Sequence, residues 1–588
     1  MFKKLPLLFL ALSLIVFLTA NVNAEVTKVS IEKAASIEKI PLDSDLDKID
    51  KPGYPYRGGD VTSPGEMVGT TWYDYQTNGS SGSRVAVHDC GVHMSWMNMI
   101  AQGGDRFAYY NFMDPEGNLG WSEGTAVSTG PRDGYVTMDV DSDGNALVAY
   151  HDSQSEPTYN CFVGVDAACG FGLFTLHAIP SEFPGQGRFI WPYIAHDNQG
   201  RYQIANTEWM ANPGDPMSIG HTYSDDGGQN WTDLSLYDPM EIMDICGTIT
   251  ASHVDDKVAI MYCKPIDDGS EPNQFNNDIV YIESPDGVTW DYQNQAVNIT
   301  NYQYQDTIRA YTDIDGVYDN NGNLHIVWNT PGYWADEGTI TTDACFLYHW
   351  SEETGTTMVY NAWFMSFPGA WNRSASKMSI GVSQSGILYV VWTHFDDIDV
   401  SAGGFSNGEL YMSYSVDNGV TWMDPVNMTE SNTEGCFPGD CESDHWSSLA
   451  EIVDENLHIL YIEDKDAGGI PQDEGAWTEN PVRYLAYPNP VTSVDDDENI
   501  PGVFELSQNY PNPFNASTNI SFALKNTADV KVEVFNLLGA KVDELVNGNL
   551  TAGEHTVSWD ASQYASGVYF YKLTADGISD TKRMVLLK

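Results

Sequence analysis

The chain has 588 residues, with 83 acidic side chains against 27 basic ones and a formal net charge of −56 at pH 7. This balance argues against nucleic acid as a partner, because phosphate binding requires clustered lysine and arginine. Hydrophobic residues make up 42% and aromatic residues 12% of the chain, which is enough for a large core. No later stretch reaches eighteen uninterrupted apolar residues, so we expect no transmembrane helix.

The first 24 residues have the three parts of a secretory signal peptide. Lys3 and Lys4 supply the charged part, residues 5–18 the apolar part, and Val22-Asn23-Ala24 the small-residue cleavage region. We therefore expect an exported mature chain that begins after Ala24. Residues 25–65 are polar, with Asp-rich and Pro/Gly-rich pieces, and are interpreted as a linker.

A turn followed by an apolar strand recurs from Met67 onward. In each copy another strand precedes the turn, and one or two further strands follow. Four short antiparallel strands repeated radially form the blade of a propeller. The sequence therefore predicts an all-β fold, with a seven-bladed β-propeller over residues 66–490 and six blades as the alternative. The apolar strands end at residues 96, 150, 205, 261, 328, 392 and 461.

The seventh unit lacks a fourth strand before the chain leaves for another domain. Residues 68–75 precede the first unit and have the composition of a strand. We expect them to complete the last blade, because that sheet would otherwise leave an unpaired edge.

Four hairpins share the pattern Ser-x-Asp-x-Gly-x-Thr-Trp or a worn form of it, at residues 224–231, 284–290, 351–358 and 415–422. They resemble the Asp boxes of sialidase-like and related β-propellers. The resemblance implies a structural role, in which Ser and Asp side chains bind turn backbone and Trp packs between blades. It assigns this role to Ser224, Asp226, Gly228, Trp231, Ser284, Asp286, Trp290, Ser415, Asp417, Gly419 and Trp422.

Eight cysteines in an exported chain favour disulfides over metal ligands. The expected pairs are Cys161–Cys169, Cys246–Cys263 and Cys436–Cys441. Cys90 and Cys345 are left unassigned. No CxxC pair indicates a zinc site.

Arginine is rare in this chain, yet five arginines lie shortly before the innermost strand of a unit, with aromatic residues and a histidine at comparable places. In a radial array these side chains would converge at one end of the channel and bind an acidic glycan or a peptide carboxylate. The alternative is that each arginine pairs with acidic loops and joins neighbouring blades. The candidate ligand residues are Arg84, Arg132, Arg188, Trp191, Arg309, Trp371, Arg373 and His445.

Asp244 and Asp444 occupy the comparable places in the two units without arginine, so they are the candidates for catalytic carboxylates. The Arg-Ile-Pro signature of sialidases is absent, and Ser83-Arg84-Val85 stands in its place. No GxSxG, HExxH or phosphate-binding loop is present. We therefore expect ligand binding without catalysis, with a sialidase-like glycoside hydrolase or lyase for acidic polysaccharide as the alternative.

No cofactor is required by the sequence. Asp139, Asp141 and Asp143-Gly144 match the opening of a calcium loop, but Tyr150 stands where a bidentate Glu is needed. In register with the other units, Asp143-Gly144 is the turn between the first and second strands. Calcium stays an alternative interpretation.

The C-terminal part begins after an acidic linker at residues 491–503. From residue 504, short alternating strands with turn signals such as Asn547-Gly548 predict an immunoglobulin-like β-sandwich over residues 504–588. The segments 508–515 (QNYPNPFN), 534–539 (VFNLLG) and 567–571 (GVYFY) closely resemble the type A C-terminal sorting domain of the type IX secretion system. The resemblance implies that residues 504–588 engage that machinery, in a Gram-negative bacterium.

Taken together, the sequence predicts a protein that crosses the periplasm and ends at the outer-membrane surface or outside the cell. Its expected partners are the secretion machinery and an extracellular glycan or protein.

Overall fold

The computed structural model describes residues 53–54, residues 63–491 with gaps at 78, 156–157, 210–216, 243–245, 267–273, 293 and 335–338, and most residues between 504 and 586. In that last part the gaps are 507–508, 510–511, 513, 525–526, 537–540, 565–566 and 576–577. The predicted signal peptide, most of the 25–65 linker and residues 492–503 lie outside the described residues. The chain divides into two compact units, Met1–Pro490 and Val491–Lys588.

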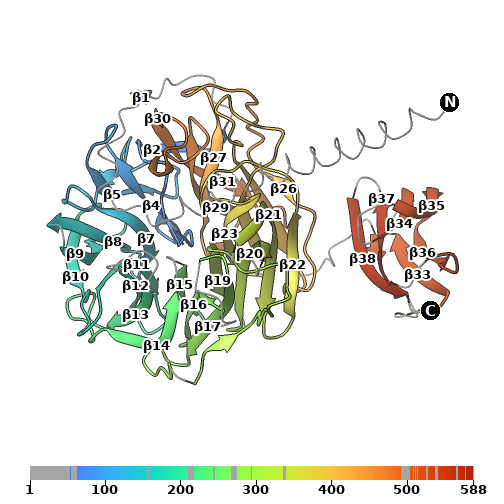
Figure 1. The fold of residues 1–588 in the computed structure, drawn as a ribbon, viewed down its shortest axis with the longest axis horizontal. Helices are drawn as coiled ribbons and strands as arrows, with labels where there is room; N and C mark the ends of the chain where they lie inside the picture. Colours follow the sequence, from blue (N-terminus) through green and yellow to red (C-terminus); the bar gives the residue numbers. More distant parts are fainter. Residues whose placement is uncertain are drawn as a thin grey trace, which may run out of the picture. The chain divides into compact units, whose positions relative to one another are not determined.

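Within the described residues, the first unit contains seven sheets of four or five strands, set around a common centre (Figure 1). Neighbouring strands of each sheet pair antiparallel, apart from one short added strand. The first three sheets are β3 (Val85–His88), β4 (Gly91–Met99), β5 (Arg106–Met113), β6 (Thr125–Ala126); β7 (Gly134–Val140), β8 (Ala146–Ser155), β9 (Thr158–Asp166), β10 (Phe174–Ile179); and β11 (Arg188–His196), β12 (Tyr202–Trp209), β13 (Met217–Ser224), β14 (Ser235–Ile242).

The next three sheets continue the same order from the centre outward. They are β15 (Gly247–Ala251), β16 (Val258–Pro265), β17 (Asn277–Ser284), β18 (Val297–Asn298); β19 (Ile314–Tyr318), β20 (Leu324–Trp334), β21 (Thr339–Ser351), β22 (Gly355–Ala362); and β23 (Ala375–Ser383), β24 (Leu388–His394), β25 (Glu409–Ser415), β26 (Val426–Asn427). The added parallel strand of the sixth sheet is β28 (Ile452–Val453), which pairs with β23.

The seventh sheet takes strands from both ends of the unit. It consists of β27 (Ser443–Leu449), β29 (Asn456–Asp464), β31 (Asn480–Pro488) and β2 (Glu66–Thr71), with Gly69 opposite Val482. The predicted closing strand is therefore present. By pairing with β31, it covers an edge that would otherwise be open. Outside these sheets, β1 (Gly53–Tyr54) pairs with β30 (Trp477–Thr478), and a short 3₁₀ helix covers Ile470–Gln472.

The core of the first unit lies between adjacent sheets. Each of the seven positions that ends a predicted apolar strand lies on the second strand of a different sheet, and each is at most 2% exposed. Three of these residues are tryptophans, Trp96, Trp328 and Trp392. Because such side chains bury large apolar areas, they supply much of the packing between sheets.

Three of the repeated turns share one set of hydrogen bonds. At Ser415 the hydroxyl donates to Asp417 Oδ1 at 2.8 Å and accepts the Gly419 N–H at 2.8 Å. Asp417 also accepts the Thr421 N–H at 2.8 Å. The turn after Ser224 repeats all three bonds, and the turn after Ser284 repeats the two made by its Asp. The Ser and Asp side chains therefore stabilise the backbone of these turns, which explains why the same residue types recur at the same spacing.

In the turn that matches the opening of a calcium loop, the Asp141 carboxylate accepts hydrogen bonds from protein groups. Asp141 Oδ1 accepts the N–H groups of Asp143 at 3.0 Å and Asn145 at 2.9 Å. Its Oδ2 accepts the Tyr202 hydroxyl at 3.2 Å. These bonds match the turn interpretation.

The disulfides differ in part from the predicted pairs. Cys436–Cys441 is present as predicted, but Cys169 pairs with Cys90 and Cys161 is a buried thiol. In the β9–β10 hairpin, Cys161 lies opposite Ile179, so it is far along the strand from the turn that carries Cys169. Cys246 lies just before β15 and its carbonyl accepts the N–H of Cys263 on β16 at 3.2 Å, but the predicted Cys246–Cys263 disulfide is not formed. Cys345 is a buried thiol.

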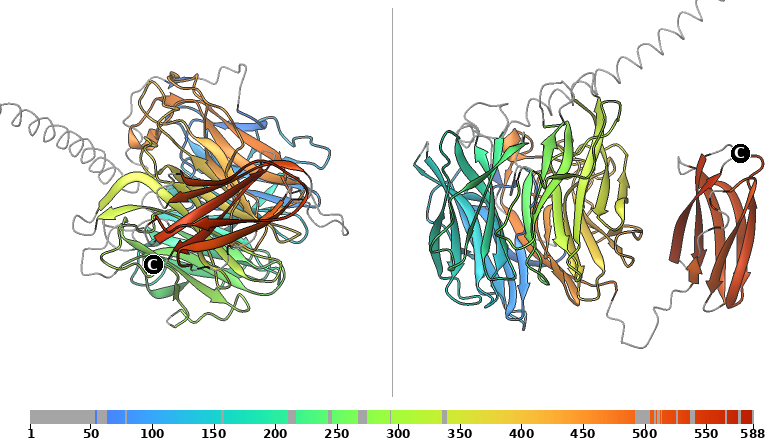
Figure 2. Two further views of the ribbon diagram at one scale, coloured as in Figure 1. Left: turned by 90° about the vertical axis from the view of Figure 1, so that its right-hand side faces the viewer. Right: turned by 90° about the horizontal axis from the view of Figure 1, so that it is seen from below.

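The second unit has two sheets around its own core (Figure 2). One sheet contains β32 (Phe504–Leu506), β33 (Ser517–Leu524) and β36 (Gly553–Asp560); the other contains β34 (Ala528–Asn536), β35 (Lys541–Leu550), β37 (Gly567–Ala575) and β38 (Ile578–Leu586). Ile520, Trp559 and Tyr571 are fully buried in this core. The sequence did not predict β35, whose residues are all exposed or half-buried.

Candidate functional site

Four innermost strands carry the same irregularity. Tyr135, Trp191, Lys377 and Trp446 have φ between 49° and 58°, and each lies at a shift of register in β7, β11, β23 or β27. A bulky residue in the left-handed region costs about 1–2 kcal/mol, so the surrounding packing must impose it. The repetition shows that these strands bend at one common level of the ring.

The segment that joins β2 to β3, residues 72–84, crosses the ring at this level. It leads from the outermost strand of the seventh sheet to the innermost strand of the first, as do the connections between the other successive sheets, but its contacts reach the centre of the ring. Backbone carbonyls of this crossing segment accept hydrogen bonds from the sixth, third and seventh sheets. Gly79 accepts from Lys377 Nζ, Ser80 from the Tyr193 hydroxyl and Gly82 from Ser448 Oγ. Most of its described residues are buried. The crossing segment therefore closes the ring centre at this level.

A buried ion pair lies beside the crossing segment. Lys377 Nζ is 2.8 Å from Asp313 Oδ1, and neither side chain is more than 1% exposed. The same ammonium lies 4.8 Å from the ring centroid of Trp446. The Lys377 N–H also donates to Asp313 Oδ2, so the carboxylate holds the strained residue at two points.

Three of the predicted ligand arginines are buried and bind protein groups. Arg84 donates to the Trp446 carbonyl, and burial lowers its pKa to about 9. Arg309 donates to Asn276 Oδ1 at 2.8 Å and to carbonyls of the loop at residues 303–308. The Nη1 atom of Arg373 lies 3.4 Å from Asp343 Oδ1, and its Cζ atom lies 3.9 Å from the ring centroid of Tyr311. All three guanidinium groups therefore lie against protein groups, and of these contacts only that of Arg373 is with a carboxylate.

The other predicted ligand residues do not form a shared opening either. Arg188 pairs with Glu182 at 2.7 Å, and Arg132 is half-buried where its backbone bridges to Arg106. Trp191 and Trp371 are at most 4% exposed, so their faces are not available to a sugar ring.

Of the two candidate catalytic carboxylates, the structure describes only Asp444. Asp244 lies outside the described residues. Asp444 is fully buried and accepts the Ser431 hydroxyl at 2.7 Å, and burial, with the charge of Glu463, raises its pKa to about 8. The Nε2 atom of His445 lies 3.4 Å from Asp464 Oδ2, and burial lowers the pKa of the His445 imidazole to about 4.

A cavity of about 300 Å³ lies on the ring axis next to the crossing segment. The first strands of all seven sheets, or the turns that follow them, contribute to its lining. Gly82 and Tyr193 bound it at the crossing segment, and exposed turn residues such as Ser142 and Asn198 bound it at the far end. The cavity therefore opens at the face opposite the crossing segment. None of the predicted ligand residues lines it.

Among the described residues, five carboxylates and three histidines line this axial cavity, and four of these residues come from four different sheets. Asp139, Asp315, Glu451 and His253 all line it. His253 Nε2 is 3.3 Å from Glu451 Oε2, and Thr250 Oγ1 lies 3.4 Å from Glu451 Oε1. Sequence reasoning missed this set because it examined the residues before the first strands, whereas these lie within the strands or after them.

Burial and the charge of Glu451 raise the pKa values of Asp139 and Asp315. Burial, followed by the charge of Glu451, raises the pKa of Asp139 to about 7, although its Oδ2 accepts the His196 N–H at 2.6 Å. Burial also raises the pKa of Asp315 to about 7. For His253, burial is outweighed by the hydrogen bond and charge of Glu451, so its pKa is raised. The cavity can therefore hold and exchange protons near neutral pH.

A second hollow, of about 560 Å³, lies beside the fourth sheet. Lys264, Asp278 and Tyr304 are among its lining residues, and Tyr304 is 50% exposed. Arg309 donates hydrogen bonds to the carbonyls of Gln303 and Tyr304, so this arginine holds the loop that lines the hollow.

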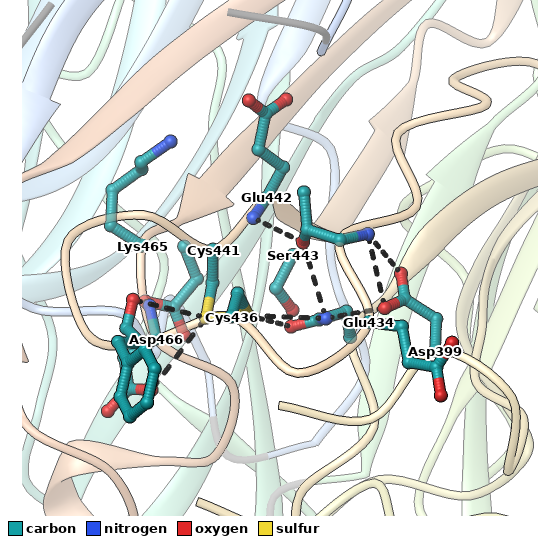
Figure 3. Close-up of a disulfide and its surroundings, with 12 residues drawn as sticks. Asp399, Glu434, Cys436, Cys441, Glu442, Ser443, Lys465 and Asp466 are labelled. Carbon is teal, nitrogen blue, oxygen red and sulfur yellow. Dashed lines mark hydrogen bonds between the residues drawn. A yellow bond between two sulfur atoms is a disulfide. The ribbon is translucent and has the colours of Figure 1, made fainter. Parts of the chain in front are cut away.

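The Cys436–Cys441 disulfide closes a short loop (Figure 3). Phe437, inside this short loop, is 68% exposed. Asp399 of a neighbouring loop accepts the Thr433 N–H, which joins the two loops. Ile398 on that second loop is 66% exposed, so two large apolar residues stand on loops held together by hydrogen bonds.

Residues 508–587 match the family of secretion system C-terminal sorting domains. This segment is a C-terminal sorting domain. It implies that the type IX secretion system exports the chain to the cell surface or the extracellular space. No helix among the described residues has the length and apolar character needed to cross a membrane.

No curated protein was found that matches the chain. Similar solved structures include an ulvan lyase of polysaccharide lyase family PL25, with 12% identity, a TM-score of 0.44, and coverage of 73% of this chain and 100% of the lyase. An α-L-arabinanase from Penicillium chrysogenum, solved with arabinobiose, has 10% identity, a TM-score of 0.38, and coverage of 59% and 92%. With TM-scores below 0.5, these matches carry no inference about activity.

Proposed function

We propose that this protein is an exported β-propeller that binds an extracellular glycan or protein in its axial cavity. The observation that carries the proposal is the convergence of Asp139, Asp315, Glu451 and His253 from four sheets on one cavity. A volume of about 300 Å³ is at the lower end of small-molecule sites. It suits the end of a chain, such as a terminal sugar or one amino-acid side chain.

The finer architecture belongs to the same proposal. We assign the seven sheets to seven blades, and the turns at Ser224, Ser284 and Ser415 to the Asp-box class of sialidase-like propellers. The shared turn hydrogen bonds and the closing strand β2 support this assignment. We assign the second unit to the immunoglobulin-like sandwiches, because its two sheets enclose one core.

The lining of the cavity determines the chemistry of the ligand. Carboxylates accept hydrogen bonds and attract cations, so a ligand group with hydroxyls or an amine fits this cavity. An acidic group would be repelled by the carboxylates. The ligand that we propose is therefore a neutral or amino-substituted glycan end or a basic peptide side chain, in place of the acidic ligand expected from the arginines.

A glycan array and a peptide library, each probed with the mature full-length chain, would test the proposal. We expect selective binding of hydroxyl- or amine-bearing probes. Glu451→Gln should weaken the selected interaction at least about tenfold, because a charge-assisted hydrogen bond contributes about 1.5–3 kcal/mol. Titration calorimetry would measure the change.

Glu116→Gln is the matched control, since Glu116 is exposed and does not line the cavity. Its binding should equal that of the wild type. If no probe binds, or if Glu451→Gln binds as the wild type does, the axial cavity is not the ligand site.

A second candidate function is glycoside hydrolysis or lyase chemistry in the same cavity. What favours it is that Asp139 and Asp315 both have pKa values near 7, where a carboxyl group can donate or accept a proton. Reducing-end and unsaturated-product assays on the glycans selected above would detect such chemistry. Loss of product with Asp315→Asn would assign it to the cavity.

A further inference from the structure

Two cysteines and a histidine meet where the first sheet borders the second. Cys90 lies in the turn between β3 and β4, His93 lies on β4, and Cys169 lies in the turn after β9. One ligand atom from each of these residues lies within 4.8 Å of the other two. In the structure the two sulfurs form a disulfide, with the imidazole directly beside it.

The separations match those of metal ligands. His93 Nε2 is 3.9 Å from Cys90 Sγ and 3.8 Å from Cys169 Sγ. Sulfur and nitrogen ligands of one tetrahedral zinc ion, at about 2.3 and 2.0 Å from the metal, lie about 3.5 Å apart. The imidazole therefore needs little movement to share an ion with both sulfurs.

The hydrogen bond on the other ring nitrogen of His93 also suits a metal ligand. Its Nδ1 lies 2.8 Å from the Tyr110 hydroxyl, and the residue is fully buried. This bond fixes the ring with Nε2 towards the sulfurs, which is the arrangement that orients metal-binding histidines. His88 Nδ1 lies 3.1 Å from Cys90 Sγ and is the nearest group for a fourth position.

The backbone also leaves room for an ion. The Cα atoms of Cys90 and Cys169 are 6.6 Å apart, near the upper end of the usual disulfide range of about 4.4–6.8 Å. Two separated thiolates therefore fit without moving the turns. Gly144 keeps the adjacent space clear, since a Cβ there would lie 2.7 Å from Cys90 Sγ and 2.6 Å from His88 Nδ1.

We propose that Cys90, Cys169 and His93 bind a zinc-like divalent ion when the disulfide is reduced, with His88 closest to the fourth position. A dithiol or phosphine reductant supplies two electrons, and the disulfide takes up two protons to become two thiols. The ion then displaces both protons as the thiolates bind it. The metal joins the same two sheets that the disulfide joins, so the border stays linked under reducing conditions.

The second disulfide provides an internal control. The sulfur of Cys436 lies near the Asn407 amide, and the sulfur of Cys441 lies near the Phe437 carbonyl and the Asp466 carboxylate. Among the described residues, the only group with metal-ligand spacing is the one at Cys90. Cobalt should therefore distinguish the two reduced pairs.

The test is cobalt titration of the mature full-length chain after anaerobic reduction with a phosphine. We expect one cobalt per chain by elemental analysis, with thiolate-to-cobalt charge-transfer absorption that zinc abolishes by displacement. The absorption should persist in the C436S/C441S variant and disappear in the C90S/C169S variant. Zinc should also raise the Tm of the reduced wild type, and a chelator should reverse that rise.

His93→Gln tests the nitrogen ligand, and we expect at least about tenfold weaker cobalt binding with an altered spectrum. The proposal is wrong if the reduced wild type binds no cobalt, or if the absorption survives in C90S/C169S. If His93→Gln fails to fold, His88→Asn is used with the same spectroscopic readout. An unchanged spectrum in whichever histidine variant folds would overturn the role of that histidine.

Discussion

Buried charges at the ring centre are paired with protein groups. Lys377 and Asp313 form such a pair, at the level where the crossing segment closes the ring. Arg84, Arg309 and Arg373 are also buried, and each contacts protein groups. The three guanidinium groups have different partners, a carbonyl for Arg84, an amide and loop carbonyls for Arg309, and a carboxylate for Arg373.

Lys377→Met should lower the free energy of unfolding of the first unit by about 3–5 kcal/mol. The substitution leaves the Asp313 carboxylate buried without its cation, which is the costly case for buried ion pairs. Thermal and denaturant unfolding would measure the loss.

The double variant Asp313→Asn/Lys377→Met should recover part of that stability, because no charge is then left unpaired. Lys257→Met is the matched control, since Lys257 and Asp255 form a partly exposed pair worth at most about 1 kcal/mol. Equal losses for Lys377→Met and Lys257→Met would contradict the buried pair.

Among the elements, β2 closes the ring by fitting closely against the first sheet. Gly69 faces the Trp96 ring, and a Cβ on Gly69 would lie 2.2 Å from that ring. The Trp96 indole N–H also donates to the Thr70 carbonyl at 3.4 Å. The strand can occupy this position because Gly69 has no side chain.

Gly69→Ala should therefore destabilise the first unit by about 1–3 kcal/mol, the usual cost of overpacking. Gly120→Ala is the control, because its nearest contact would be an ordinary 3.6 Å, and we expect a change within about 0.5 kcal/mol. Unfolding curves of both variants would show the difference. Equal stabilities would mean that β2 does not pack against Trp96.

At the scale of the whole molecule, buried ionisable groups set opposite pH limits on stability. Burial lowers the pKa of His93, His221 and His349 from 6.5 to about 3, so the unfolded chain binds more protons in that range. Their contribution to stability is lost as the pH falls from about 6.5 to 3. Burial raises the pKa of Asp315 and Asp444 from 3.8 to about 7 and 8, so here the folded chain binds more protons.

The contribution of those two carboxylates is therefore lost as the pH rises from about 4 to 8. The two sets oppose each other between about pH 4 and 6.5. Above pH 6.5 only the two carboxylates change the free energy of unfolding with pH, and below pH 4 only the three histidines do. We expect a plateau of stability between these limits and a decline on both sides.

Asp444→Asn should remove part of the decline above pH 6.5. Because one pKa unit corresponds to about 1.4 kcal/mol, we expect the variant to gain at least that much over the wild type between pH 5 and pH 8. Urea unfolding at several pH values measures this, with Glu116→Gln as the unaffected control. Parallel pH profiles for Asp444→Asn and the wild type would show that Asp444 is ionised in the folded chain.

The sequence by itself determined the local pattern of this protein. Strand positions follow from apolar periodicity, as the burial of Trp96, Trp328 and Trp392 shows. The repeated turns follow from Ser and Asp side chains that bind backbone groups within a few residues. The closing strand followed from the need to cover a sheet edge, and the sorting domain from motifs contained in one short segment. Apart from the closing strand, which pairs the two ends of the unit, all of these depend on interactions that are local or repeated at a fixed period.

Only the tertiary structure decided which distant side chains meet. The Cys90–Cys169 disulfide joins turns of two different sheets, and no spacing in the sequence records that proximity. The axial cavity likewise depends on where Asp139, Asp315 and Glu451 fall around the axis once the sheets have closed into a ring. The tertiary structure likewise decided the surroundings of Arg84, Arg309 and Arg373, which are buried against protein groups. Periodicity gives the place of a residue within its repeat, but solvent access and partners at the centre depend on how all the sheets and the crossing segment pack together.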